Sequence, residues 1–222
     1  GASTQVGVAV TDAVPAGVSY VAASSQITYP VTTNNNARDQ FGTLTYTNSD
    51  GTIAWLGAWQ ETNEANGAAV ENVSVLADGT NGNVMAIENN GFGAYRLADL
   101  SPNTEAVLTF RYRRIALDGA TDYVGIWASG NGGGSWTEVS RILGTSNESS
   151  YVLSTNVDIS AFIATNTAIM FLSSGMGNNE IVYLDDIDIA VLRRIYKTEA
   201  AAPPPLLTSA KTVMGGEYLR IT

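Results

Sequence analysis

Three aspartates stand close together in the last long strand expected before the tail, in Y-L-D-D-I-D-I over residues 183–189. In a strand, alternation would put Asp186 and Asp188 on one face and Asp185 on the other. Carboxylate oxygens are ligands that suit Ca²⁺, and a pair of carboxylates can also cleave a glycosidic bond. No pair in this sequence sits in a recognisable glycosidase motif, so we expect a protein that is not an enzyme. The alternative for these acids is a solvated strand end.

Aromatic side chains are the second group with possible chemistry, because flat rings can stack on sugars. Trp136 follows the glycine-rich run 130–134, which contains Asn131, and Trp136 and Asn131 are our candidates for glycan binding. The alternative is structural: Trp55 and Trp127 would lie in the core, Trp136 would pack over the hairpin, and Asn131 with Ser135 would form a polar turn.

The composition excludes several classes of function. The chain of 222 residues has no Cys and no His, which removes disulfides, thiolate metal sites and triads that need either residue. Its net charge of −10 makes nucleic acid a poor partner. No apolar run approaches the roughly 20 residues of a membrane span, so we expect no membrane insertion. Abundant Gly, Ser, Thr and Asn with only 14% charged residues favour an all-β protein with many loops.

The elements that would position these groups are clearest between Glu105 and Arg141. Apolar and polar residues alternate over 107–113, 123–129 and 136–141, which predicts three consecutive antiparallel strands. The run 130–134 contains four glycines and supplies the positive φ angles of a hairpin turn. Arginines at 111, 113 and 114 are expected to form ion pairs with acidic neighbours across the sheet.

Segments from about Trp55 to Leu192 resemble a jelly-roll β-sandwich. The resemblance rests on these motifs: W-L-G-A-W-Q-E, Y-R-L-A-D-L-S, A-V-L-T-F-R-Y-R, Y-V-G-I-W-A-S-G-N-G-G-G-S-W-T, V-D-I-S-A-F-I, I-M-F-L-S-S and V-Y-L-D-D-I-D-I. Domains of the MAM and laminin-G type share this skeleton with many bacterial carbohydrate-binding modules. In related jelly rolls, a carboxylate on the last strand joins one near the first strand to hold a structural Ca²⁺. The resemblance implies Glu61, Asp185 and Asp186 as that site, with Glu64 as an alternative to Glu61. No other cofactor is expected.

The two chain ends resemble another family. Residues 8–24 read V-A-V-T-D-A-V-P-A-G-V-S-Y-V-A-A-S, which is similar to the second half of an Ig-like repeat of bacterial and archaeal surface proteins. The tail reads G-G-E-Y-L-R-I-T over 215–222, similar to the first half of the same repeat, with Gly215 where the family commonly has Pro. We therefore expect residues 1–52 to be the second half of a repeat with its connection, 53–194 the jelly roll, 195–205 a Pro-rich linker, and 206–222 the first half of a repeat.

Neither half-repeat could bury its apolar face alone. The missing half could come from the other end of the same chain, from adjacent repeats of a longer chain, or from a neighbouring subunit by β-strand addition. Head-to-tail addition that does not close generates a filament. The main hypothesis is therefore an extracellular structural subunit or repeat of a surface fibre, and the alternative is a carbohydrate-binding or adhesive module. The assembly residues would be Val6, Val8, Val10, Leu206, Leu207, Tyr218, Leu219 and Ile221.

Overall fold

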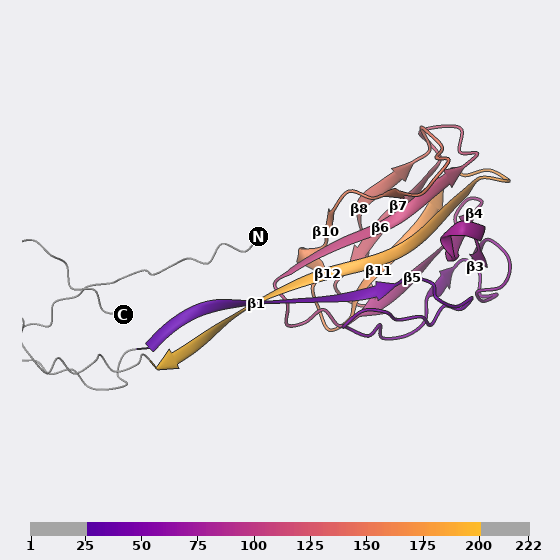
Figure 1. The fold of residues 1–222 in the computed structure, drawn as a ribbon. Helices are drawn as coiled ribbons and strands as arrows, with labels where there is room; N and C mark the ends of the chain where they lie inside the picture. Colours follow the sequence, from indigo (N-terminus) through magenta and orange to yellow (C-terminus); the bar gives the residue numbers. More distant parts are fainter. Residues whose placement is uncertain (1–25, 201–222) are drawn as a thin grey trace, which may run out of the picture. The chain divides into compact units, whose positions relative to one another are not determined.

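The structure of the protein is a computed structural model that describes residues 26–200, with the side chains of 33–193 except Thr80. The chain divides into two compact units, residues 32–194 and residues 1–31 with 195–222. The unit of residues 32–194 is an all-β jelly-roll sandwich of two facing sheets, and residues 26–200 contain no α-helix (Figure 1).

The larger sheet has seven strands, β1 (Gln26–Asp39), β3 (Val73–Ala77), β4 (Asn83–Glu88), β6 (Glu105–Ile115), β9 (Val152–Leu153), β10 (Val157–Asp158) and β12 (Ile181–Ala200). Their order is β10-β6-β12-β4-β3, with β1 paired to β12 and β9 paired to β6. Two single 3₁₀ turns, Gly79–Asn81 and Ser160–Phe162, interrupt the connections.

The smaller sheet has five strands, β2 (Gln60–Thr62), β5 (Gly93–Ala98), β7 (Tyr123–Ser129), β8 (Thr137–Leu143) and β11 (Thr167–Ser174). Their order is β2-β5-β11-β7-β8, and each neighbouring pair is antiparallel. The predicted strands 107–113, 123–129 and 136–141 correspond to β6, β7 and β8, although β6 lies in the opposite sheet from the other two.

The inner faces of both sheets form one hydrophobic core, because alternate residues of each strand turn inward. Phe110 of β6 meets Phe171 of β11 edge to face, with ring centroids 5.1 Å apart. Trp59 packs on the same Phe171 at 6.2 Å. This aromatic contact joins the two layers at the middle of the sandwich.

A β-bulge in β12 changes the alternation that the sequence predicts for its aspartates. The register with β6 shifts between Asp185 and Asp188, and Asp186 has a left-handed φ of 48°. Leu184 before the bulge and Ile187 after it both lie in the core. Asp185 and Asp188 therefore face the same way, whereas simple alternation places Asp185 opposite to Asp186 and Asp188.

Other boundaries also differ from the sequence prediction. Residues 32–52 belong to the sandwich unit, since Ala37, Phe41 and Tyr46 are buried in its core. Strand β12 continues to Ala200, through part of the segment predicted as a linker. Residues 1–25 of the predicted first half-repeat and all of the predicted half-repeat 206–222, with all eight predicted assembly residues, lie outside the described residues.

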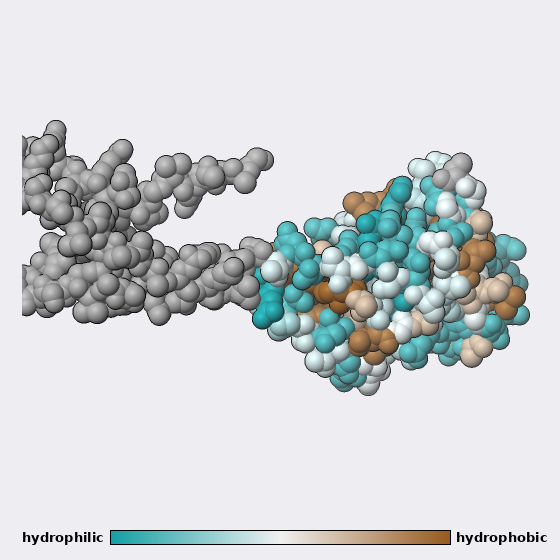
Figure 2. Space-filling view, turned by 60° about the horizontal axis from the view of Figure 1, so that its bottom comes forward, coloured by the Kyte–Doolittle hydropathy of each residue, from teal (hydrophilic) through white to brown (hydrophobic). Residues whose placement is uncertain are grey.

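On the face that Figure 2 draws, hydrophilic residues predominate and hydrophobic ones gather in small separate patches. Few large apolar side chains are strongly exposed among the described residues: Leu44, Leu56, Val70, Leu143 and Leu153. A search of the described residues finds no helix that is long and apolar enough to cross a membrane.

Candidate functional site

The outer face of the five-stranded sheet carries a continuous row of aromatic and polar side chains. Strand register places Gln60 beside Tyr95, Tyr95 beside Met170, Met170 beside Trp127, and Trp127 beside Glu138. The row thus crosses all five strands. We call these five residues the outer row.

Alternation along each strand turns the outer row away from the core. In β5, Ala94 and Ala98 are core residues, and Tyr95 lies between them in sequence. In β7, Ile126 and Ala128 are core residues on either side of Trp127. Trp127 is half-buried on the outer face, so the interpretation that it belongs to the core is wrong, whereas Trp55 is buried in the core.

A bulge in β8 brings two charged groups onto this face together. The register shifts between Ile126 and Trp127, so that Trp127 pairs with Glu138 and Gly125 with Arg141. The Arg141 guanidinium donates to both carboxylate oxygens of Glu138, from Nε at 2.6 Å and from NH2 at 2.7 Å. It also lies 4.3 Å from the centre of the Tyr123 ring. The pair presents polar atoms whose charges balance each other.

Gly125 determines how the Trp127 indole lies. A Cβ at position 125 would be 2.6 Å from Trp127 Nε1 and 2.9 Å from a Glu138 carboxylate oxygen. The indole and the carboxylate therefore both lie over Gly125, and any residue with a Cβ at this position would displace them. Trp127 Nε1 is buried and has no hydrogen-bond partner, which leaves one polar donor unsatisfied on this face.

Trp136 extends the aromatic surface from the loop before β8. Its ring lies 5.8 Å from that of Tyr95 at an interplanar angle of 71°. The Tyr95 hydroxyl donates to Gln60 Oε1 at 2.6 Å, so both rings are held in place. Trp136 is the one predicted glycan-binding residue that lies beside the outer row.

The Asn131 side chain stabilises the turn between β7 and β8 by hydrogen bonds. Its Oδ1 accepts from the Ser129 hydroxyl at 2.8 Å and from the Ser135 N–H at 2.9 Å. Its Nδ2 donates to Ser135 Oγ at 3.0 Å. Both ends of the amide are therefore engaged within the hairpin, and the structure supports the polar-turn alternative for this residue.

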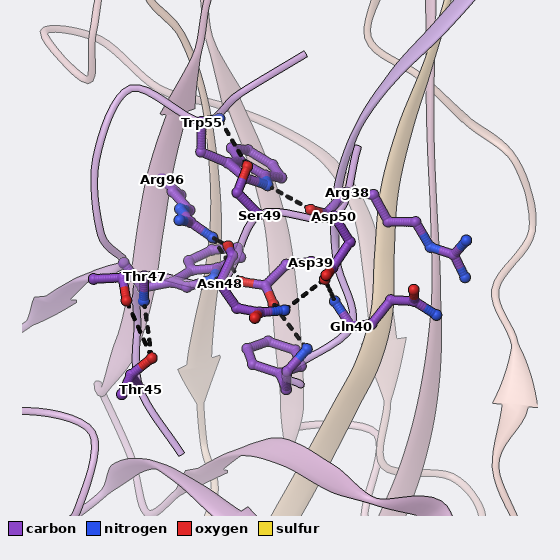
Figure 3. A network of polar contacts seen from close by, with 12 residues as sticks. Arg38, Asp39, Gln40, Thr45, Thr47, Asn48, Ser49, Asp50, Trp55 and Arg96 are labelled. Carbon is purple, nitrogen blue, oxygen red and sulfur yellow. Dashed lines mark hydrogen bonds and ion pairs between the residues drawn. The ribbon is translucent and has the colours of Figure 1, made fainter. Parts of the chain in front are cut away.

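A buried ion pair supports β5 from behind the outer row (Figure 3). Arg96, next to Tyr95, donates to Asp39 Oδ2 at 2.6 Å, and both residues are at most 1% exposed. The same oxygen accepts from Trp59 Nε1 at 2.9 Å. The guanidinium also lies over the Trp55 ring at 5.0 Å. Two of the four tryptophans are thus committed to this structural cluster.

The predicted calcium site does not fit the structure. Glu61 lies in β2 of the smaller sheet, where its Oε1 is 2.8 Å from the Tyr46 hydroxyl and its Oε2 accepts from the Asn66 N–H at 2.6 Å. Asp186 accepts from Arg38 at 2.8 Å and from Gln40 at 3.0 Å. Among the described residues, the one acidic group whose oxygens converge is elsewhere. We therefore do not retain Glu61, Asp185 and Asp186 as a metal site.

The pKa values of the two neighbouring aspartates are shifted in opposite directions. Burial raises the pKa of Asp185 to about 6, with the Asp186 N–H and the charges of Arg111 and Arg38 opposing the rise and the charge of Asp186 adding to it. Burial also acts on Asp186, but hydrogen bonds from Arg38 and Gln40 hold its pKa below the usual range. Asp185 is thus a carboxyl without a direct cationic partner, and Asp186 is an ion-paired one.

The arginines of β6 form the expected ion pairs. Arg113 contacts Asp78 at 3.1 Å, Arg111 contacts Asp186 at 3.9 Å, and Arg114 pairs with Glu148. Asp186 lies in the neighbouring strand β12, whereas Asp78 and Glu148 lie in loops. The expected ion pairs are therefore present, but only that of Arg111 is cross-strand, and they do not form a ladder.

Beside the outer row, the edge of the smaller sheet has a hollow of about 350 Å³. Its lining includes Trp59, Gln60 and Glu64. Gln60 belongs to both features, so the hollow continues the outer row past β2. The lining also includes Tyr46, Glu61, Ala65 and Gly67.

No protein-family model and no curated protein matches the sequence. Solved structures with a similar fold include the xylan-binding module CBM15, which is 13% identical with a TM-score of 0.44 over 75% of this chain and 97% of that chain. The K2 cleaved adhesin domain of Lys-gingipain is 15% identical with a TM-score of 0.46 over 69% of this chain and 98% of that one. The CBM22-1 xylan-binding domain of Paenibacillus barcinonensis Xyn10C is 11% identical with a TM-score of 0.46, over 70% and 93%. At these values the similarity concerns the arrangement of strands, and nothing about a ligand follows from it.

Sequence reasoning misses most of the outer row. Gln60, Met170 and Glu138 are not among its candidates, Tyr95 is not singled out from the other tyrosines, and a place in the core is its alternative for Trp127. Polar–apolar alternation in A-Y-R-L-A would turn Arg96 outward and Tyr95 inward, whereas Arg96 is buried and Tyr95 lies on the outer face. The neighbours of each residue across the sheet also depend on a strand order that no single segment contains.

Proposed function

We propose that the sandwich of residues 32–194 is a carbohydrate-binding module, and that its ligand lies across the outer row. One observation carries the proposal: strand register lines up Tyr95 and Trp127 with Gln60 and Glu138 on a solvent-facing sheet surface. Aromatic faces flanked by a few polar groups that fix orientation are the usual composition of a small-molecule site.

The charges of this face favour a neutral glycan. Glu138 and Arg141 neutralise each other, and Gln60 is uncharged. A chain with a net charge of −10 repels anionic polysaccharides. Hydroxyl groups of a neutral sugar could instead bond to the exposed edges of the Glu138–Arg141 pair, while its C–H faces stack on Trp127, Tyr95 and Trp136.

The row is long enough for several sugar units, because it crosses five strands spaced about 4.8 Å apart. We therefore expect an oligosaccharide or polysaccharide ligand that runs across the strands. A single monosaccharide would contact only one of the aromatic rings and should bind more weakly.

The test is binding of the full chain to a panel of neutral polysaccharides by affinity electrophoresis, followed by calorimetry with oligosaccharides of increasing length. We expect Trp127→Ala and Tyr95→Ala each to weaken binding at least about tenfold, as loss of a central aromatic anchor does. Tyr183→Ala is the matched control, because Tyr183 is a half-buried aromatic of β12 in the other sheet. Unchanged affinity in both outer-row variants would overturn the proposal, as would an equal loss in the control.

A further inference from the structure

Three carboxylates from two different turns converge at one end of the sandwich. Asp118 and Asp122 lie between β6 and β7, and Glu180 directly precedes β12. Each offers a carboxylate oxygen, and these oxygens all lie within 4.8 Å of one another. Asp122 and Glu180 are 5% and 6% exposed, so two of the three groups are removed from water.

One oxygen of this cluster is buried without a partner. Asp122 Oδ2 has no hydrogen bond and no access to solvent, whereas Oδ1 of the same group accepts from the Thr121 hydroxyl at 3.3 Å. Oδ2 lies 3.4 Å from the position of a Cβ at Gly119, the residue after Asp118, so it faces the turn that carries Asp118. Such an oxygen is costly to bury unless something positive faces it.

No cation of the protein fills that role among the described residues. None of the ion pairs found there includes Asp118, Asp122 or Glu180. Three adjacent carboxylates without a counter-charge repel one another.

The backbone holds the two turns in contact. A Cβ at Gly175 would lie 2.1 Å from the Thr121 carbonyl oxygen, and Gly175 has a φ of +76°. The Gly144 N–H donates to the Asp122 carbonyl at 2.6 Å. The Gly177 N–H donates to Glu180 Oε2, which orients that carboxylate and leaves Oε1 for another contact. The cluster is therefore assembled by the fold before any ligand arrives.

We propose that Asp118, Asp122 and Glu180 bind a calcium ion that joins the β6–β7 turn to the β11–β12 turn. Ca²⁺ takes oxygen ligands at about 2.3–2.6 Å, so two oxygens on opposite sides of the ion stand up to about 5 Å apart, and three oxygens that lie within 4.8 Å of one another can share one ion. Water supplies the remaining positions on the side of the exposed Asp118. Mg²⁺ is the weaker candidate, because it demands near-ideal octahedral geometry and dehydrates reluctantly, whereas Ca²⁺ accepts flexible geometry.

The site is distinct from the outer row and does not depend on glycan binding. Strand β7 begins at Tyr123 and strand β11 ends at Ser174, and these two residues pair with each other. The ion would therefore stabilise the end of the smaller sheet at which β7 begins. Its role in this proposal is structural: it neutralises two buried charges and one exposed charge and fixes two turns.

The experiment uses the full chain, stripped with EGTA and then titrated with CaCl₂ while thermal unfolding is followed. With free Ca²⁺ at about a hundred times Kd, we expect the Tm to rise by about 5–10 °C. Tb³⁺ gives a second readout, because Tyr123 next to Asp122 can sensitise its luminescence, and Ca²⁺ should displace it from one site per chain.

Asp122→Asn keeps the shape of the side chain and removes its charge, so we expect loss of both the Tm shift and the Tb³⁺ signal. In EGTA this variant should unfold at or above the temperature of the wild type, because the repulsion is relieved, which separates lost binding from lost folding. Glu71→Gln is the control, since it removes one exposed carboxylate outside the cluster. A wild type that shows neither response to Ca²⁺ nor Tb³⁺ binding overturns the proposal, and so does an Asp122→Asn variant that responds as the wild type does.

Discussion

At the scale of single residues, the ion pair of Asp39 and Arg96 is the most enclosed polar contact described. The Asp39 carboxylate accepts from Arg96, from Trp59 Nε1 and from the Phe41 N–H, so each of its oxygens is satisfied. Arg96 also donates to the carbonyls of Gly57 and Asn48, at 2.7 Å each. One guanidinium thereby ties β5 to the loop that connects β1 and β2.

We expect Arg96→Met to lower the free energy of unfolding by about 3–5 kcal/mol, because it leaves the Asp39 charge buried and unpaired. Arg38→Met is the matched control. Its pair with Asp186 is about one third exposed, so its loss should cost no more than about 1 kcal/mol. Urea unfolding of both variants measures the two free energies. Equal decreases for Arg96→Met and Arg38→Met would contradict the larger effect that we expect for the buried pair.

Asp185 predicts a pH dependence of stability. Its native pKa of about 6 lies above the unfolded value of about 3.9, so between these values the native state holds the extra proton. Stability from this group is therefore present in full below about pH 4 and decreases as the pH rises through 6. At pH 7.5 the ionised group costs up to about 3 kcal/mol.

Asp185→Asn should remove that cost, because the amide carries no charge. Its oxygen can still accept the hydrogen bond from the Asp186 N–H, which is 2.7 Å long in the wild type. We expect the variant to be more stable than the wild type at pH 7.5 and nearly equal to it at pH 4. Denaturant unfolding at both values measures the difference. A gap between the two proteins that is the same at pH 4 and pH 7.5 would contradict the raised pKa.

At the scale of elements, two glycines in the smaller sheet have different roles. A Cβ at Gly125 would collide with the movable end of the Trp127 side chain, whereas one at Gly93 would lie 2.0 Å from the Phe171 carbonyl oxygen of the neighbouring strand. The first contact can be relieved by rotating an indole, and the second only by moving a strand.

The same substitution should therefore have separate effects at the two positions. We expect Gly125→Ala to lower glycan affinity with little change in Tm, because it displaces a ring of the outer row. Gly93→Ala should lower the Tm by more than about 5 °C, because it separates paired strands. Calorimetry of binding and of unfolding on both variants gives the two readouts. A lower Tm for Gly125→Ala than for Gly93→Ala would refute this division.

Alternation is sufficient to predict regular strands and fails where a strand is irregular. Strands β6, β7 and β8 follow from their alternating residues. The extra residues at Val139 and at Asp186 reverse the alternation, and neither bulge has a marker in the sequence. The tripeptide Asn34-Asn35-Asn36 gives loop signals, yet it lies in β1, because pairing with β12 outweighs local preference. The alternation F-G-T-L-T-Y-T over 41–47 favours a strand, yet this segment is irregular.

The candidate sites illustrate the same limit. Trp136 could be found from its own neighbourhood, since the glycine run that precedes it is local. The outer row and the carboxylate cluster each combine residues from segments far apart in the chain, and their assembly depends on strand order. Asp118, Asp122 and Glu180 stand in no motif, so nothing in the sequence distinguishes them from other acids.

At the scale of the whole molecule, the sandwich is a separate unit, and its core residues all lie between Ala37 and Val191. Deletion of residues 206–222 should therefore leave its thermal transition and its glycan affinity unchanged. Calorimetry of the truncated chain tests this, and loss of the transition would show that the sandwich depends on the tail. Head-to-tail assembly through that tail stays a prediction, and electron microscopy of the native material alongside the truncated chain examines it.

The first and last strands of the sandwich are antiparallel neighbours. Arg38 of β1 contacts Asp186 of β12, and Asn36 contacts Asp188. One strand therefore runs backward as the other runs forward. The chain thus enters and leaves at the same end (Figure 1). A force that pulls the two ends apart acts across this ladder, along the direction of its hydrogen bonds. The bonds would break one after another, as in a zipper, so a tether attached at these ends would peel the domain open at low load instead of shearing it.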